Sequence, residues 1–193
     1  MKPGRALAAA ALVLVAIAMA WLLFVTLPRR YRAPATAPAA ATAPAATTAA
    51  APGRKIKAHL YYVSADGAHL SGVERDVPFG ATTVDQARQI VEAQIAPVAD
   101  PLVSAIPPGT TLRALFVTDK GEAYVDLSRE VSAAHGGGSL DELLTIYTIV
   151  DVLTTNLPAV TGVQLLVDGR EVDTLAGHVD LRRPLAKNLE WIQ

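Results

Sequence analysis

The sequence predicts an α+β domain of mainly antiparallel sheet, preceded by one transmembrane helix. Three observations predict it: an uncharged apolar run near the N-terminus, three turn signals between segments rich in β-branched and aromatic residues, and two segments with helical caps and helical periodicity. In chain order, the elements after the membrane segment are expected to follow the pattern ββαββαββ within a single domain.

The apolar run covers residues 6–27 and contains no charged side chain. As a helix it spans about 33 Å at ~1.5 Å per residue, close to the thickness of a bilayer core. Ala18-Met19-Ala20 also matches a signal-peptidase site, so a cleaved signal is the alternative. Because the apolar run continues well past this triplet, we expect a retained anchor. We place the basic tail, residues 1–5, in the cytoplasm and the later residues outside.

Residues 28–54 are predicted to be a linker, because residues 33–52 consist only of Ala, Pro and Thr. Proline disfavours helix, and a segment without large apolar side chains buries too little surface to fold. In an extended, partly polyproline form this segment reaches at most ~60 Å. The linker would therefore lift the following domain, residues 55–193, away from the bilayer.

Charge is distributed unevenly along the chain. All 18 Asp and Glu residues but only 11 of the 17 Lys and Arg residues lie in residues 55–193, a formal net charge of −7 (11 − 18). An acidic domain repels phosphate backbones, which argues against nucleic acid as a partner. The chain has no cysteine, which excludes a lipid anchor attached to that residue.

Each of three hairpin signals places a glycine-containing turn between two strand-like segments. The paired strands are expected at residues 60–63 and 69–77, 112–118 and 122–127, and 163–167 and 170–175. Within the first strand, Tyr61 and Tyr62 point to opposite faces, so only one is expected in the core. The turns are Asp66-Gly67, Asp119-Lys120-Gly121 and Asp168-Gly169.

Two helices are expected between the hairpins. The first covers residues 83–95 and opens with a capping box formed by Thr83 and Gln86. The second runs from Ser139 to about Thr155, with a capping box formed by Ser139 and Glu142. This second helix is apolar around most of its circumference, which predicts either a central buried helix or a helix with a second apolar face against a partner. The partner-facing candidates are Ile146, Ile149 and Leu153.

Candidates for metal or anion binding are few. His178 and Asp180 share one face of an extended segment and, with His135, form the best candidate metal set, although no standard ligand spacing supports it. The segment from His135 to Gly138 precedes a helix N-terminus, where free N–H groups bind anions. The acidic side chains that open this helix would repel phosphate, so we predict a connector there and no metal or cofactor site.

Candidates for catalysis are also weak. Asp126 with Glu130, and Asp173 with Asp180, are candidate acid–base pairs, but carboxylates at strand ends are common on acidic surfaces. No serine lies in a G-x-S-x-G motif. We therefore predict no catalytic residues and a protein that is not an enzyme. A hydrolase using Asp126, Asp180 or His178 is kept as an alternative.

Several segments, in one order along residues 57–187, carry a family resemblance. They are SAIPPGT (104–110), YVDLSRE (124–130), GGSLDEL (137–143), YTIV (147–150), VQLLVDG (163–169) and GHVDL (177–181), followed by Pro184-Leu185. This pattern resembles the GerMN domain of the sporulation and spore-germination protein GerM family. The resemblance implies a membrane-tethered, extracytoplasmic, non-enzymatic domain of the bacterial envelope. It also implies a fold similar to the ring-building α+β modules of secretion and sporulation machines.

Two functions remain open for such a protein. The first is an interaction or scaffold domain in envelope assembly, which binds envelope proteins or itself. The second is a module that binds peptidoglycan or another envelope glycan through exposed aromatic rings. In both, the chain is expected to be single-pass in the bacterial inner (cytoplasmic) membrane, with its domain on the extracytoplasmic or periplasmic side. The aromatic candidates are Tyr61, Tyr62, Phe79, Phe116, Tyr124, Tyr147 and Trp191.

Overall fold

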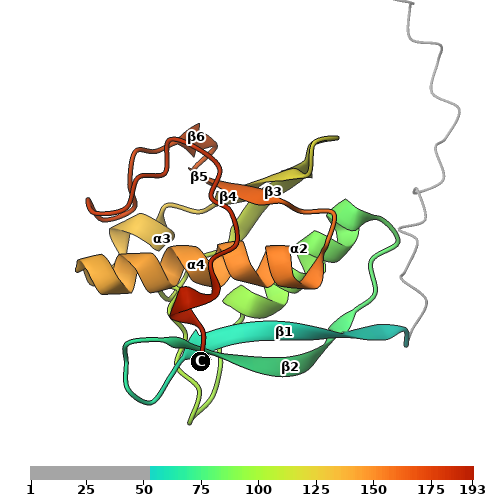
Figure 1. Ribbon diagram of the computed structural model, residues 1–193, viewed down its shortest axis with the longest axis horizontal. Coiled ribbons are helices and arrows are strands. Elements are labelled where there is room, and N and C mark those ends of the chain that lie inside the picture. The colour runs from blue at the N-terminus through green and yellow to red at the C-terminus, as the bar shows by residue number, and fades with distance from the viewer. Residues whose placement is uncertain (1–52) are drawn as a thin grey trace, which may run out of the picture. The chain divides into compact units, whose positions relative to one another are not determined.

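The computed structural model describes residues 53–193, which form an α+β domain (Figure 1). The expected tail and anchor, and nearly all of the expected linker, lie outside the described residues. No helix within residues 53–193 combines the length and hydropathy that a membrane span requires. The elements are β1 (Lys55–Val63), β2 (Leu70–Pro78), α2 (Thr83–Ile95), β3 (Leu112–Val117), β4 (Glu122–Leu127), α3 (Glu130–Ala133), α4 (Ser139–Asn156), β5 (Gly162–Val167), β6 (Arg170–Glu171) and the 3₁₀ turn η1 (Leu189–Trp191).

The described strands form two sheets. β1 and β2 make an antiparallel hairpin, and the second sheet has the strand order β3-β4-β5-β6. In that second sheet β3 and β6 pair antiparallel with their neighbours, whereas β4 and β5 pair parallel. A parallel pair needs a long crossover connection, and α4 supplies it. The expected mainly antiparallel sheet is confirmed, with one parallel pair that local turn signals did not show.

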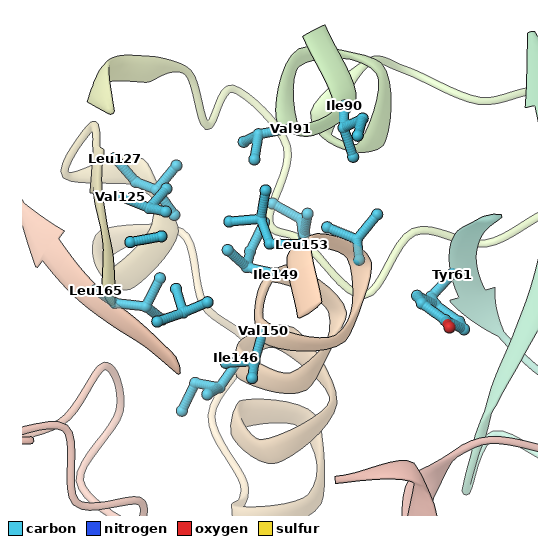
Figure 2. Packing of buried hydrophobic residues seen from close by; sticks show 14 of the residues in the cluster. Tyr61, Ile90, Val91, Val125, Leu127, Ile146, Ile149, Val150, Leu153 and Leu165 are labelled. Atoms are coloured by element: carbon cyan, nitrogen blue, oxygen red, sulfur yellow. The ribbon is translucent and has the colours of Figure 1, made fainter. Parts of the chain in front are cut away.

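Helix α4 is the centre of the domain. Figure 1 shows it running between the β1–β2 hairpin and the four-stranded sheet. In Figure 2, its apolar side chains lie between those of β4 and β5 on one side and Tyr61 of β1 on the other. Ile146, Ile149 and Leu153 are at most 1 % exposed. The central buried helix is therefore confirmed, and the alternative of a face turned toward a partner is wrong.

Four local expectations need correction. Helix α2 is capped by Thr82, whose hydroxyl accepts a hydrogen bond from the Asp85 N–H, so the capping box lies one residue earlier than expected. Helix α4 begins after Gly138 without a side-chain cap. The one-turn helix α3 was not expected. Strand β6 contains two residues instead of six, because the chain beyond it turns toward α4.

The outer edge of β1 is closed by two side-chain amides. The Gln94 side chain accepts from the Tyr61 N–H at 2.8 Å and donates to the Tyr61 carbonyl at 2.7 Å. Asn156 does the same for His59, at 2.9 and 2.8 Å. Both amides therefore substitute for a neighbouring strand. An edge satisfied in this way is unavailable for pairing with another chain.

Both tyrosines of β1 are buried, contrary to the expectation that only one would be. Tyr61 is 4 % exposed, and its hydroxyl lies 3.1 Å from the Thr155 hydroxyl of α4. Tyr62 is 1 % exposed on the opposite face, where the Arg75 guanidinium lies 5.5 Å from the centre of its ring. The expectation failed because β1 is covered on both faces.

Candidate binding groove

A groove of about 400 Å³ opens at the end of the β1–β2 hairpin. Its walls are the end of β1, the loop of residues 103–108, the segment before α4, and the first turns of α4. Most of the side chains that line it are apolar: Val63, Val103, Ala105, Ile106, Pro107, Pro108, Ala134 and Leu144. The polar ones are Ser104, His135, Asp141 and Thr145. Concave apolar sites of this size are the usual form of a ligand or peptide pocket.

Hydrogen bonds from two elements fix the loop wall of the groove. The Val63 N–H donates to the Val103 carbonyl at 2.8 Å, which attaches the loop to the end of β1. The Thr145 hydroxyl of α4 donates to the Ala105 carbonyl at 2.6 Å. The loop is thus held from both sides, and Val103 still exposes 56 % of its surface at the rim.

His135 lines the groove as a structural residue. Its Nδ1 accepts a hydrogen bond from the Gly137 N–H at 3.0 Å, and its Nε2 lies 3.2 Å from the Thr145 hydroxyl. In the neutral ring the proton therefore sits on Nε2 and points at that hydroxyl. Both ring nitrogens are occupied within the protein. The imidazole fastens the glycine-rich segment to α4, so it is not a free metal ligand.

Glu142, expected in a capping box, has a different role. Its side chain is 0 % exposed and reaches the loop after β6. One carboxylate oxygen accepts from the N–H groups of Leu175 and Ala176, at 2.8 and 2.9 Å. The other accepts from the His178 N–H at 2.8 Å and contacts His178 Nδ1 at 3.0 Å. We call this set of contacts the Glu142 latch.

The environment of the latch keeps the carboxylate ionised. Burial alone would raise the pKa of Glu142, but the N–H groups of Ala176, His178 and Leu175, together with the His178 ring, outweigh it. The pKa is held below its ordinary value of 4.5. The latch therefore engages Nδ1 of His178 and leaves Nε2 outside it. The only sequence signal for the latch was an acid in the first turn of a helix.

Three of the candidate carboxylates, Asp126, Glu130 and Asp180, are held in separate ion pairs. Asp180 pairs with the Arg182 guanidinium at 2.8 Å. Asp126 pairs with Arg113 at 3.1 Å and accepts from a turn N–H, whereas Glu130 lies 3.4 Å from its neighbour Arg129. Within residues 53–193, no group of three His, Asp or Glu side chains is placed to hold a metal ion. The candidate metal set of His135, His178 and Asp180 and the candidate Asp126–Glu130 pair are therefore not assembled. In the other candidate pair, Asp173 with Asp180, the Asp180 carboxylate is held by Arg182.

An aromatic pair formed by the exposed Phe116 and the half-buried Tyr124 lies away from the groove. Phe116 of β3 is 64 % exposed and stands directly opposite Tyr124 of β4 in the antiparallel register. Neighbouring residues in such a register project to the same face of the sheet. This pair contains the most exposed aromatic ring among the described residues and lies on the solvent-facing side of the four-stranded sheet.

Residues 59–173 match the model of the Germane family, described as sporulation and spore germination. The chain belongs to this family, and the resemblance inferred from its motifs is confirmed. The family description names a biological process and no reaction. Two of the resembling segments, residues 104–110 and 137–143, meet at the groove.

Solved structures give the same fold. The chain is similar to the tandem GerMN domains of the sporulation protein GerM from Bacillus subtilis, with 20 % identity and a TM-score of 0.55, over 69 % of this chain and 46 % of that one. It is also similar to the first GerMN domain of that protein, with 19 % identity and a TM-score of 0.51, over 68 % and 97 % of the two chains. No curated protein matches the chain.

Proposed function

We propose that this chain is a membrane-tethered, extracytoplasmic interaction domain in bacterial envelope assembly of the sporulation and germination type. It acts without catalysis, and its groove receives an apolar segment of a partner protein. The observation that carries the proposal is the exposure of Val103, at 56 %, on the rim of a groove with mainly apolar walls.

The hydrogen bonds of His135 and Thr145 support recognition and not chemistry. His135 and Thr145 are paired with each other and with the backbone, so neither is free to activate a substrate. Apolar walls bind by removing surface from water, at roughly 25 cal/mol per Å² of apolar area. A partner that covers Val103 would therefore gain affinity without any change in these hydrogen bonds.

The argument for a partner no longer rests on helix α4, because Ile146, Ile149 and Leu153 are buried inside the domain. Support for the tether comes from the sequence: the apolar run of residues 6–27 and the linker that follows it. A partner in the same envelope would therefore have to lie within the reach of the linker from the membrane.

The test is site-specific photo-crosslinking in cells that carry the full-length chain. A photo-crosslinking residue at Val103 is expected to capture one envelope protein, or a second copy of the chain. The same residue at Lys120, in the exposed turn between β3 and β4, is the matched control and is expected to capture neither. Equal adducts at both positions, or none at Val103, would contradict the proposal.

A second candidate is binding of peptidoglycan or another envelope glycan. The observation that favours it is the Phe116–Tyr124 pair, because sugars stack on exposed aromatic rings. Tyr61 and Tyr62 no longer support it, since both are buried. Co-sedimentation of the full chain with purified cell wall tests it: Phe116→Ala should abolish pelleting, and wild-type protein that stays in the supernatant would exclude the candidate.

A further inference from the structure

Asp151 is a buried carboxylate with one unsatisfied oxygen. It lies in the C-terminal half of α4 and is 0 % exposed. Its Oδ1 accepts from the Asn188 N–H at 2.9 Å, whereas its Oδ2 has no hydrogen-bond partner. A buried carboxylate with a free lone pair is unfavourable when ionised. Its cost would be relieved if the segment that carries Asn188 moved away and admitted water.

Residues 188–193, which we call the strap, are fastened at two ends. At one end is the Asn188–Asp151 hydrogen bond. At the other, the Gln193 N–H donates to the Leu70 carbonyl at 2.9 Å, and the Gln193 side-chain amide donates to Asp66 at 3.1 Å. Leu189, between the ends, is 50 % exposed. Trp191 and Ile192 are half-buried against the core, and Ile192 forms a bridge with Leu70. Opening of the strap breaks these contacts but leaves both sheets paired, so it is a local event below the free energy of global unfolding.

The far end of the strap also touches a wall of the groove. Gln193 contacts Asp66 and His69, which belong to the β1–β2 turn, and Gly67 of the same turn lines the groove. His69 Nδ1 in turn lies 2.8 Å from the Asp66 carboxylate. A closed strap therefore supports this turn, and an open strap releases it.

We propose that the strap opens and closes with pH. It is closed over Asp151 in mild acid and opens more often as Asp151 ionises. The charged and titratable groups that face Asp151 are Lys187, next to the strap, and the Tyr61 phenol from β1. At the other end of the strap they are Asp66 and His69. The proposal does not rest on the groove binding a partner.

The pKa values of Asp151 in the closed and open states determine whether strap opening rises or falls with pH. Burial raises the pKa of Asp151 from 3.8 to about 6, against the opposing effects of the Asn188 N–H and of Lys187. In the open state the carboxylate is in water and regains its ordinary pKa. Between pH 4 and pH 6 only the closed state holds the proton, so the opening constant rises with pH. A difference of two pKa units between the states corresponds to roughly a 100-fold increase in the opening constant. The opening constant stops rising above pH 6.

The test is hydrogen exchange of the strap amides in the full chain, held in detergent micelles, at pH values from 4 to 7.5. After correction for the intrinsic exchange rate, the opening constant of the wild type should rise roughly 100-fold and then level off. Asp151→Asn should remove this rise. His69→Gln, which removes the histidine that contacts the strap, should preserve it.

Three results would overturn the proposal: a flat profile for the wild type, a rise that persists in Asp151→Asn, or a rise that disappears in His69→Gln. If Asp151→Asn folds poorly, the wild-type and His69→Gln profiles still decide the question. None of these measurements involves a partner, so they fail or succeed separately from the crosslinking at Val103.

Discussion

Replacing Glu142 with Gln should destabilise the domain severely. The carboxylate accepts four hydrogen bonds. Three come from backbone N–H groups, which can only donate, and the fourth comes from the His178 ring, which donates here. In the Glu142→Gln variant, the side-chain NH₂ group must face one pair of these donors in either orientation of the amide. That pair of donors then loses its acceptor. Removing one partner of a buried, charge-assisted set costs about 3–5 kcal/mol, a large part of the 5–15 kcal/mol of a typical domain.

The assay is urea denaturation of Glu142→Gln beside Asp141→Asn, the same chemical change one residue earlier on an exposed side chain. Asp141 lies in the first turn of α4, where a negative charge contributes about 0.3–1 kcal/mol. The difference between the two variants should therefore exceed 2 kcal/mol. Equal costs would show that the latch contributes nothing beyond the helix dipole, and the reasoning would fail.

The pH dependence of this difference is a second check. The folded pKa of Glu142 lies below its ordinary 4.5, so its contribution is complete above pH 4.5 and is lost as the pH falls through the lowered value. The wild type and Glu142→Gln should accordingly converge in stability below pH 4.5. A difference that stayed constant through this range would mean that Glu142 does not change ionisation there.

Three further substitutions test the packing. Gln94→Leu should cost about 2–4 kcal/mol in urea titrations, because it leaves a buried N–H and carbonyl of β1 unpaired. Gly121→Ala should cost at least 1 kcal/mol more than Gly137→Ala in the same assay: both glycines have φ near +84°, but only at Gly121 would a Cβ lie 2.5 Å from the Ala159 carbonyl oxygen. Phe116→Ser should change the unfolding free energy by less than about 0.5 kcal/mol, since that ring is mostly exposed.

Local signals in the sequence located most elements. Thr83–Ile95 was predicted at its observed bounds, and the end of α4 was placed within one residue. The turns with Asp-Gly or Asp-Lys-Gly each join two strands as expected. Helix periodicity and turn chemistry depend on neighbours a few residues away, which is why a single sequence reveals them.

Long-range pairing was not predictable in the same way. The parallel register of β4 with β5 has no local signature, because the two strands are joined through the whole of α4. The apolar circumference of α4 was correctly recognised from the sequence. However, its second apolar face could be buried equally well by another sheet of the domain or by another protein. Only the positions of both sheets distinguish the two cases.

The candidate site was harder still to predict, because its polar residues act across the fold. Helix α4 carries four that each fix a segment distant in sequence: Glu142 holds the loop at Leu175 (33 residues away), Thr145 the loop at Ala105 (40), Asp151 the strap at Asn188 (37) and Asn156 strand β1 at His59 (97). Each of these residues fits a solvated or capping position when only its neighbours are considered.

These four contacts explain how one helix positions both the groove and the strap. The apolar side chains of α4 bind the two sheets without strong directional preference, since hydrophobic burial depends on area. Hydrogen bonds are directional, so the polar side chains decide where each loop lies on that core. A substitution such as Thr145→Val removes the hydrogen bond to Ala105 and the contact with the His135 ring, while keeping the helix and its apolar contacts. It should therefore displace the Ala105 wall of the groove, and reduce capture at Val103, at little cost to the rest of the fold.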